Sequence, residues 1–178
     1  MELENLSAEA SGALCCATSL RIGGALYILA EAAGLEDAYY RADAGIRANM
    51  RAYSGRGLNS SIPEDGLAAC RDLSAAFPLE NPDSDFFRAG LGVVKLGLGA
   101  VLQEIHQSLV AEVFQKTSHA VSTWQAAADE GLEEYELSCQ ESSILAVRTQ
   151  GIAALRKAAG EGALRYRRAA QSALSSRD

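Results

Sequence analysis

Two histidines, His106 and His119, are the side chains best suited here to binding a metal or moving a proton. A di-metal centre in a helical bundle combines glutamates with a Glu-x-x-His spacing, which places both side chains on one helix face. Glu104 stands two residues before His106, on nearly the opposite face, and Lys116 stands three residues before His119. We therefore expect no metal centre and no bound cofactor.

The cysteines form no Cys-x-x-Cys pair, and with two histidines in the chain no zinc-site spacing is present. We interpret them as free thiols, mostly buried, of a protein in a reducing compartment. The cysteines are Cys15, Cys16, Cys70 and Cys139.

Motifs for nucleophilic catalysis and nucleotide binding are missing from the sequence. The chain contains no Gly-x-Ser-x-Gly, no P-loop and no Gly-x-Gly-x-x-Gly after a predicted strand. Neither histidine stands in a visible constellation with a nucleophile. These observations predict a protein that is not an enzyme.

Charge is distributed unevenly along the chain. The formal net charge is −7, but residues 1–147 carry a net −12 and residues 148–178 a net +5. An acidic protein repels phosphate, so nucleic acid is not an expected partner. The acidic residues gather at Asp129, Glu130, Glu133, Glu134, Glu136 and Glu141. The basic residues follow at Arg148, Arg156, Lys157, Arg165, Arg167 and Arg168.

An acidic run of this kind is typical of a solvated helix end. It would also dock on a basic surface, and the nearest basic surface belongs to the same chain. We therefore favour pairing between the two charged segments, within one molecule or head-to-tail between copies, over binding of a foreign partner. The basic segment also matches the preference of helix C-termini for Lys and Arg.

Proline, the residue most hostile to a helix interior, does not occur after Pro82. Good helix formers dominate the rest of the chain, and no segment alternates as a strand would. Ser7 is a suitable N-cap and Gly34 a suitable C-terminal stop for a first helix. We predict an all-α bundle of five to six helices in one domain, 1–178, with a subdivision into 1–77 and 84–174 as the alternative. The predicted helices are 8–33, 36–55, 61–77, 84–117, 118–137 and 142–174.

Apolar residues at helical spacing define the predicted core. Its members are Leu29, Ile46, Leu73, Leu91, Val94, Leu98, Leu102, Ile105, Leu109, Val113, Trp124, Leu145, Ile152 and Leu155. Gly23 and Gly24 in the first helix indicate a kink or a close helix crossing. Gly90 and Gly97, seven residues apart, leave a smooth strip that another helix backbone can approach.

These features favour a non-enzymatic interaction protein that acts by helix–helix docking and self-associates, in an adaptor, chaperone, structural or effector role. The alternative is a carrier of an apolar small molecule or pigment held in the Gly/Ala-rich gap near Gly90 and Gly97, with Cys70 or His106 as an anchor. A third hypothesis is membrane association through residues 86–102. The candidate interaction residues are Gly90, Gly97, Trp124, Glu133, Glu134, Arg156, Arg165 and Arg168.

The location expected from the sequence is the cytoplasm. Glu2 and Glu4 stand where a secretory signal would carry Lys or Arg. A protein delivered without a cleavable signal peptide is the alternative.

Overall fold

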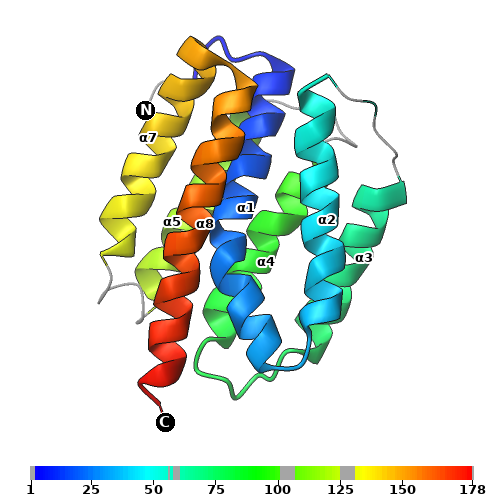
Figure 1. Cartoon of the computed structure of the whole chain (residues 1–178), viewed down its shortest axis with the longest axis vertical. Coiled ribbons are helices and arrows are strands. Elements are labelled where there is room, and N and C mark those ends of the chain that lie inside the picture. The colour runs from blue at the N-terminus through cyan, green and yellow to red at the C-terminus, as the bar shows by residue number, and fades with distance from the viewer. Residues whose placement is uncertain (1–2, 56, 58–60, 101–106, 125–130, 178) are drawn as a thin grey trace.

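The computed structural model describes residues 3–55, 57, 61–100, 107–124 and 131–177, and within them it contains seven helices and no strand (Figure 1). The prediction of an all-α bundle is confirmed, and the number of helices exceeds the five to six expected. The helices are α1 (Ala8–Ala32), α2 (Glu36–Tyr53), α3 (Ser61–Ala76), α4 (Ser84–Gly99), α5 (Gln107–Thr123), α7 (Leu132–Gln150) and α8 (Ile152–Ser175).

The first three helices were predicted closely, because their ends carry clear local signals. The Ser7 hydroxyl accepts a hydrogen bond of 3.1 Å from the backbone N–H of Ala10 and caps α1. Gly34, just beyond α1, has a φ of 70°, a left-handed conformation that glycine adopts without strain.

The predicted helices 84–117, 118–137 and 142–174 were divided wrongly. α4 ends at Gly99 and α5 already begins at Gln107, so position 118 lies inside α5. The predicted boundary within 137–142 lies inside α7, which starts directly after Gly131 with its φ of 61°. The long last helix is interrupted at Gly151, where a φ of 79° ends α7 and lets α8 fold back beside it.

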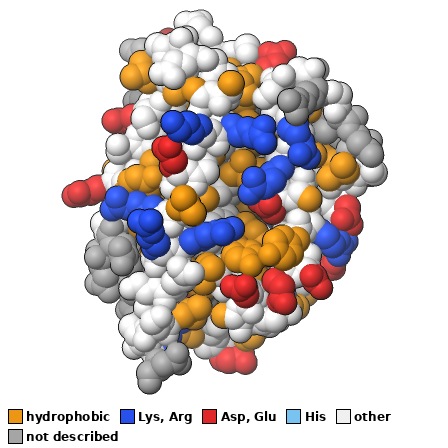
Figure 2. Space-filling view, in the orientation of Figure 1, with side chains coloured by type: hydrophobic (Ala, Val, Ile, Leu, Met, Phe, Trp, Pro, Cys, Tyr) orange, Lys and Arg blue, Asp and Glu red, His pale blue; other side chains and the backbone are white. Residues whose placement is uncertain are grey.

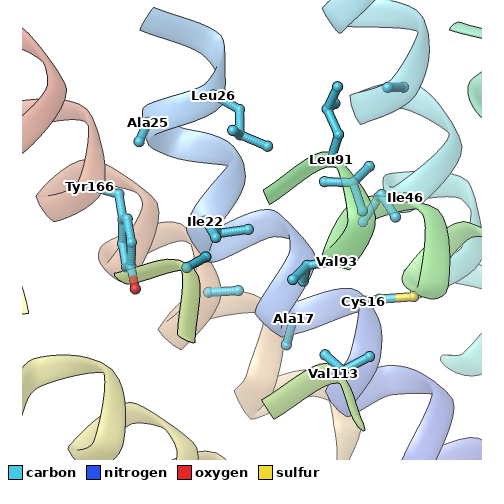
Figure 3. Close-up of a cluster of buried hydrophobic side chains, with 14 of the residues drawn as sticks. Cys16, Ala17, Ile22, Ala25, Leu26, Ile46, Leu91, Val93, Val113 and Tyr166 are labelled. Carbon is cyan, nitrogen blue, oxygen red and sulfur yellow. The ribbon is translucent and has the colours of Figure 1, made fainter. Parts of the chain in front are cut away.

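Helix α1 is the centre of the bundle and packs against α8, α2, α4, α5 and α7. Figure 3 shows α1 between Leu91 and Val93 of α4 on one side and Tyr166 of α8 on the other. By length and hydropathy α1 is the one described helix able to cross a membrane, and 89% of its apolar window is buried inside the bundle. Its uniform apolarity is therefore that of a core helix.

The crossing of α1 and α8 is unusually close. A Cβ atom at Gly24 would overlap the Ala163 carbonyl, and one at Gly162 would lie 2.7 Å from the Cγ and Cδ atoms of Arg21. Gly24 thus marks a close helix crossing, one of the two expectations for it.

Most of the predicted core is buried, but not all of it. The clearest exception is Leu145, which is 63% exposed because α7 turns a different row of residues inward. Leu109 and Ile152 are only partly buried, and Leu102 and Ile105 lie outside the described residues. The buried members are Leu29, Ile46, Leu73, Leu91, Val94, Leu98, Val113, Trp124 and Leu155.

Candidate functional site

A groove runs between α2 and α8, with α1 as its floor, and contains two adjoining pockets. We name it the α2/α8 groove. The first pocket has a volume of about 110 Å³ and is lined by Leu20, Arg47, Met50, Arg156, Ala159, Gly160 and Ala163. The second, of about 40 Å³, continues past Gly23, Gly24, Tyr27, Tyr39, Tyr40, Asp43 and Arg167, and shares Leu20, Arg47 and Ala163 with the first.

Helical spacing explains how the groove forms. Arg156, Gly160, Ala163 and Arg167 are separated by four, three and four residues, so they share one face of α8. Their two small members lie at the centre and keep the floor low, and Ala163 lies over Gly24 of α1. The long arginine side chains stand at either end, so α8 contributes a basic rim around a shallow apolar base.

Helix α2 supplies the opposite wall with Tyr40, Asp43, Arg47 and Met50. Figure 2 shows Lys and Arg side chains gathered over α8 and α2 on this face, with hydrophobic side chains between them. The protein as a whole carries a net charge of −7, so this basic patch differs in sign from the molecule around it.

The arginines of the groove differ in how they are held. Arg47 donates from Nε to Asp43 at 2.5 Å, and this hydrogen bond raises the pKa of Arg47. The Arg167 guanidinium lies 4.7 Å from the centroid of the Tyr27 ring. Arg156 has no hydrogen-bond or ion-pair partner among the described residues. One aspartate therefore faces three arginines, and the groove attracts negative charge.

Of the predicted interaction residues, Arg156 lies in this groove, and Gly90 and Gly97 lie in the interior. A Cβ atom at Gly90 would meet Leu26 at 2.8 Å, and one at Gly97 would overlap Ser19. The smooth glycine strip therefore receives α1 of the same chain.

Trp124 is also interior and belongs to a clamp at the start of α4. Its ring stacks on Phe86 with centroids 3.9 Å apart, and its Nε1 donates to Asp83 at 2.9 Å. Asp83 also accepts hydrogen bonds of 2.6 and 2.9 Å from Arg177. The clamp ties the C-terminal end of the described chain to α4.

The remaining predicted residues are exposed on α7 and α8. Glu133 and Glu134 lie at the start of α7, and Arg168 projects from α8. The Arg165 guanidinium lies 4.4 Å from the centroid of the Tyr135 ring on α7. His119 is exposed on α5, and His106 lies outside the described residues.

One member of the acidic run is not solvated, which corrects the sequence interpretation. Glu136 is fully buried and accepts hydrogen bonds from Arg21 of α1, at 2.7 Å from Nε and 2.6 Å from Nη2. Tyr166 and Gln140 donate to the same carboxylate at 2.9 and 3.0 Å. Burial lowers the pKa of Arg21, but the charge of Glu136 and its hydrogen bonds to Arg21, with smaller contributions from Tyr166 and Cys139, together outweigh burial, and the net shift is upward.

This buried cluster was missed because its members lie far apart in the sequence. The available signal was an arginine inside the apolar run of α1, together with Glu136 on the inward i, i+4 row of α7 that includes Leu132 and Gln140. The cluster is sealed from solvent, so it joins α1, α7 and α8 and offers no open site.

The thiols are protected in the same way. Cys15, Cys16 and Cys70 are buried, and burial raises the pKa of Cys15 and of Cys70 to about 12. Cys139 is partly exposed. Within the described part of the chain, no group of three His, Cys, Asp or Glu side chains could hold a metal ion.

Comparisons with protein-family models, with curated proteins and with solved structures find no match to this chain. The α2/α8 groove is therefore interpreted from its own geometry.

Proposed function

We propose that this chain is a non-enzymatic interaction protein that docks an acidic helix of a protein partner in the α2/α8 groove. The observation that supports this most strongly is the combination of a low floor of small residues, Gly24, Gly160 and Ala163, with a rim of arginines. Small residues let a helix approach closely, and the arginines select the charge of the helix.

The size of the pocket beside Met50 favours an anchoring side chain over a whole small molecule as the occupant of the α2/α8 groove. Pockets for small ligands usually measure about 300–1,000 Å³. The pocket beside Met50 measures about 110 Å³ and has Leu20 and Ala159 in its wall, which suits one aliphatic side chain. Buried anchors of this kind contribute most of the binding energy at protein interfaces.

The apolar-carrier alternative receives less support. Its expected gap near helix α4 is occupied, since Gly90 faces Leu26 and Gly97 faces Ser19. Cys70, one expected anchor, is buried in the core. Residues 86–100 of the segment considered for membrane association contribute Leu91 and Val94 to the same core.

A labelled peptide titration tests the proposal. The probe is a designed helical peptide that carries one leucine flanked by glutamates at positions −4, −3 and +4, and its binding is followed by fluorescence anisotropy. We expect saturable binding to the wild-type protein and a loss of at least about tenfold for Arg47→Glu/Arg156→Glu, since rim charges and a buried anchor act together.

The matched control is Arg71→Glu/Lys116→Glu, which makes the same change in net charge at exposed positions on α3 and α5. It should bind the peptide as the wild type does. Equal losses in both variants, or no binding to the wild type, would contradict the proposal. A peptide with lysines in place of the glutamates should not bind.

A further inference from the structure

We infer that the helix docked in the α2/α8 groove is α7 of a second copy of this chain, an inference that rests on the proposed function. One exposed face of α7 carries the required chemistry. Leu137 is 49% exposed, and Glu133, Glu134 and Glu141 stand at positions −4, −3 and +4 from it. This spacing places the leucine and the three carboxylates on one side of the helix. We name these four residues the α7 face.

The charges of the α7 face are unpaired within the described part of the molecule. Glu133, Glu134 and Glu141 have no hydrogen-bond or ion-pair partner among the described residues. Three like charges within two turns repel one another, so the face gains from a basic partner. Leu137 lies between those charges and exposes part of its apolar side chain to solvent.

The α2/α8 groove complements this face in both charge and shape. Leu20, Met50 and Ala159 offer an apolar pocket for Leu137, and its volume of about 110 Å³ suits a single side chain. Arg47 and Arg156 line the same pocket, within reach of flanking carboxylates. Arg156, which has no partner among the described residues, then faces the glutamates of the other molecule.

The groove and the α7 face of one molecule cannot meet each other. In Figure 1, α7 borders α8 on the side opposite to α2, so α8 and α1 separate the two surfaces. Docking therefore joins two different surfaces of two copies, a heterologous contact that continues into a ring or a chain of molecules. A single docked helix buries less surface area than a standard protein–protein interface. The association is therefore weak and depends on protein concentration and salt.

Sedimentation velocity of the full-length protein tests the inference with two charge-reversed variants. The groove variant is Arg47→Glu/Arg156→Glu, and the face variant is Glu133→Arg/Glu134→Arg. We expect the wild type to form larger species as its concentration rises, and we expect high salt to dissociate these species. Each variant alone should remain monomeric at concentrations where the wild type and Arg71→Glu/Lys116→Glu associate. All substitutions are at surface positions, and circular dichroism checks that each variant is folded.

Mixing the two variants gives the decisive result. The groove variant retains an intact α7 face, and the face variant retains an intact groove, so the mixture should form complexes that neither variant forms alone. A monomeric wild type, a face variant that associates normally, or a mixture without complexes would overturn the second copy as the occupant. Binding of the peptide to the groove would then still support the proposed function. If the peptide does not bind while the protein self-associates, the proposed function is wrong and the self-association uses another surface.

Discussion

Arg21 of α1 and Glu136 of α7 form a two-pronged ion pair, with N···O distances of 2.7 and 2.6 Å, in the interior of the bundle. Tyr166 of α8 donates to the same carboxylate. The first helix and the last two helices of the chain therefore meet at one charged cluster. Such a cluster fixes the relative register of the helices that form it, because a shifted helix would leave a buried charge without its partner.

Removing one partner of this pair should be costly. We expect Arg21→Met to lower the free energy of unfolding by about 3–5 kcal/mol, since Glu136 would remain buried without its counter-ion. Urea denaturation measures the change. The matched control is Arg41→Ala, which breaks the exposed pair with Asp65 and should change stability little. The double variant Arg21→Met/Glu136→Leu should recover part of the loss, and no recovery would contradict this view of the pair.

The close crossing of α1 and α8 predicts opposite effects for two glycine substitutions. Gly24→Ala forces a methyl group against the Ala163 carbonyl and should destabilise the fold by about 1–3 kcal/mol. Gly92→Ala places its methyl group in open space inside α4 and should stabilise by about 0.5–1 kcal/mol. Thermal or urea unfolding compares them, and equal effects would exclude the close contact.

The clamp between Asp83, Trp124 and Arg177 predicts a loss of stability in acid. Burial raises the pKa of Asp83, but hydrogen bonds from Arg177 and Trp124 outweigh it, so the pKa lies below 3.8. A lowered pKa in the folded state gives stability that is present above roughly pH 4 and is lost as the pH falls through the folded value.

Urea midpoints measured from pH 7 down to pH 2.5 test this dependence. Asp83→Asn should be less stable than the wild type at pH 7, and the difference should shrink as the pH falls below roughly 4. A difference that stays constant over this range would show that the charge of Asp83 contributes nothing.

Burial of the thiols predicts selective modification. At pH 8 the reagent dithiobisnitrobenzoate should react with Cys139 in the folded protein, because the pKa of Cys15 and of Cys70 is about 12 and both are enclosed. All four cysteines should react in urea. The variant Cys139→Ser tests whether Cys139 is the reacting thiol. Rapid reaction of this folded variant would contradict the burial of the other three thiols.

The parts of the fold that were predictable are those with local signals. Ser7 and Gly34 bound α1 because capping and left-handed glycine act within a few residues. Gly151 was missed because glycines also occur inside α8, at Gly160 and Gly162, and only packing of α7 on α8 decides which of them ends a helix.

The groove was less predictable for a related reason. Arg156 was among the expected interaction residues, but Arg47 and Met50 belong to a helix in the first third of the chain. Arg47 and Met50 lie close to Arg156 because α2 and α8 both pack on α1. The spacing of these residues in the sequence does not indicate that they are close. Gly90 was expected at an interaction surface, and Trp124 was named both there and in the core, since small and aromatic residues suit either an interface or a core.

Methionine methyl NMR tests most directly whether an acidic helix docks in the α2/α8 groove. The chain has two methionines, Met1 and Met50, and Met50 lines the first pocket of the α2/α8 groove. With methyl-labelled methionine, addition of the acidic leucine peptide should shift the Met50 resonance progressively and leave the Met1 resonance in place. The lysine peptide should have no effect, and Arg156→Glu should weaken the shift. An unchanged Met50 resonance under conditions where the acidic peptide binds would place docking elsewhere and contradict the account.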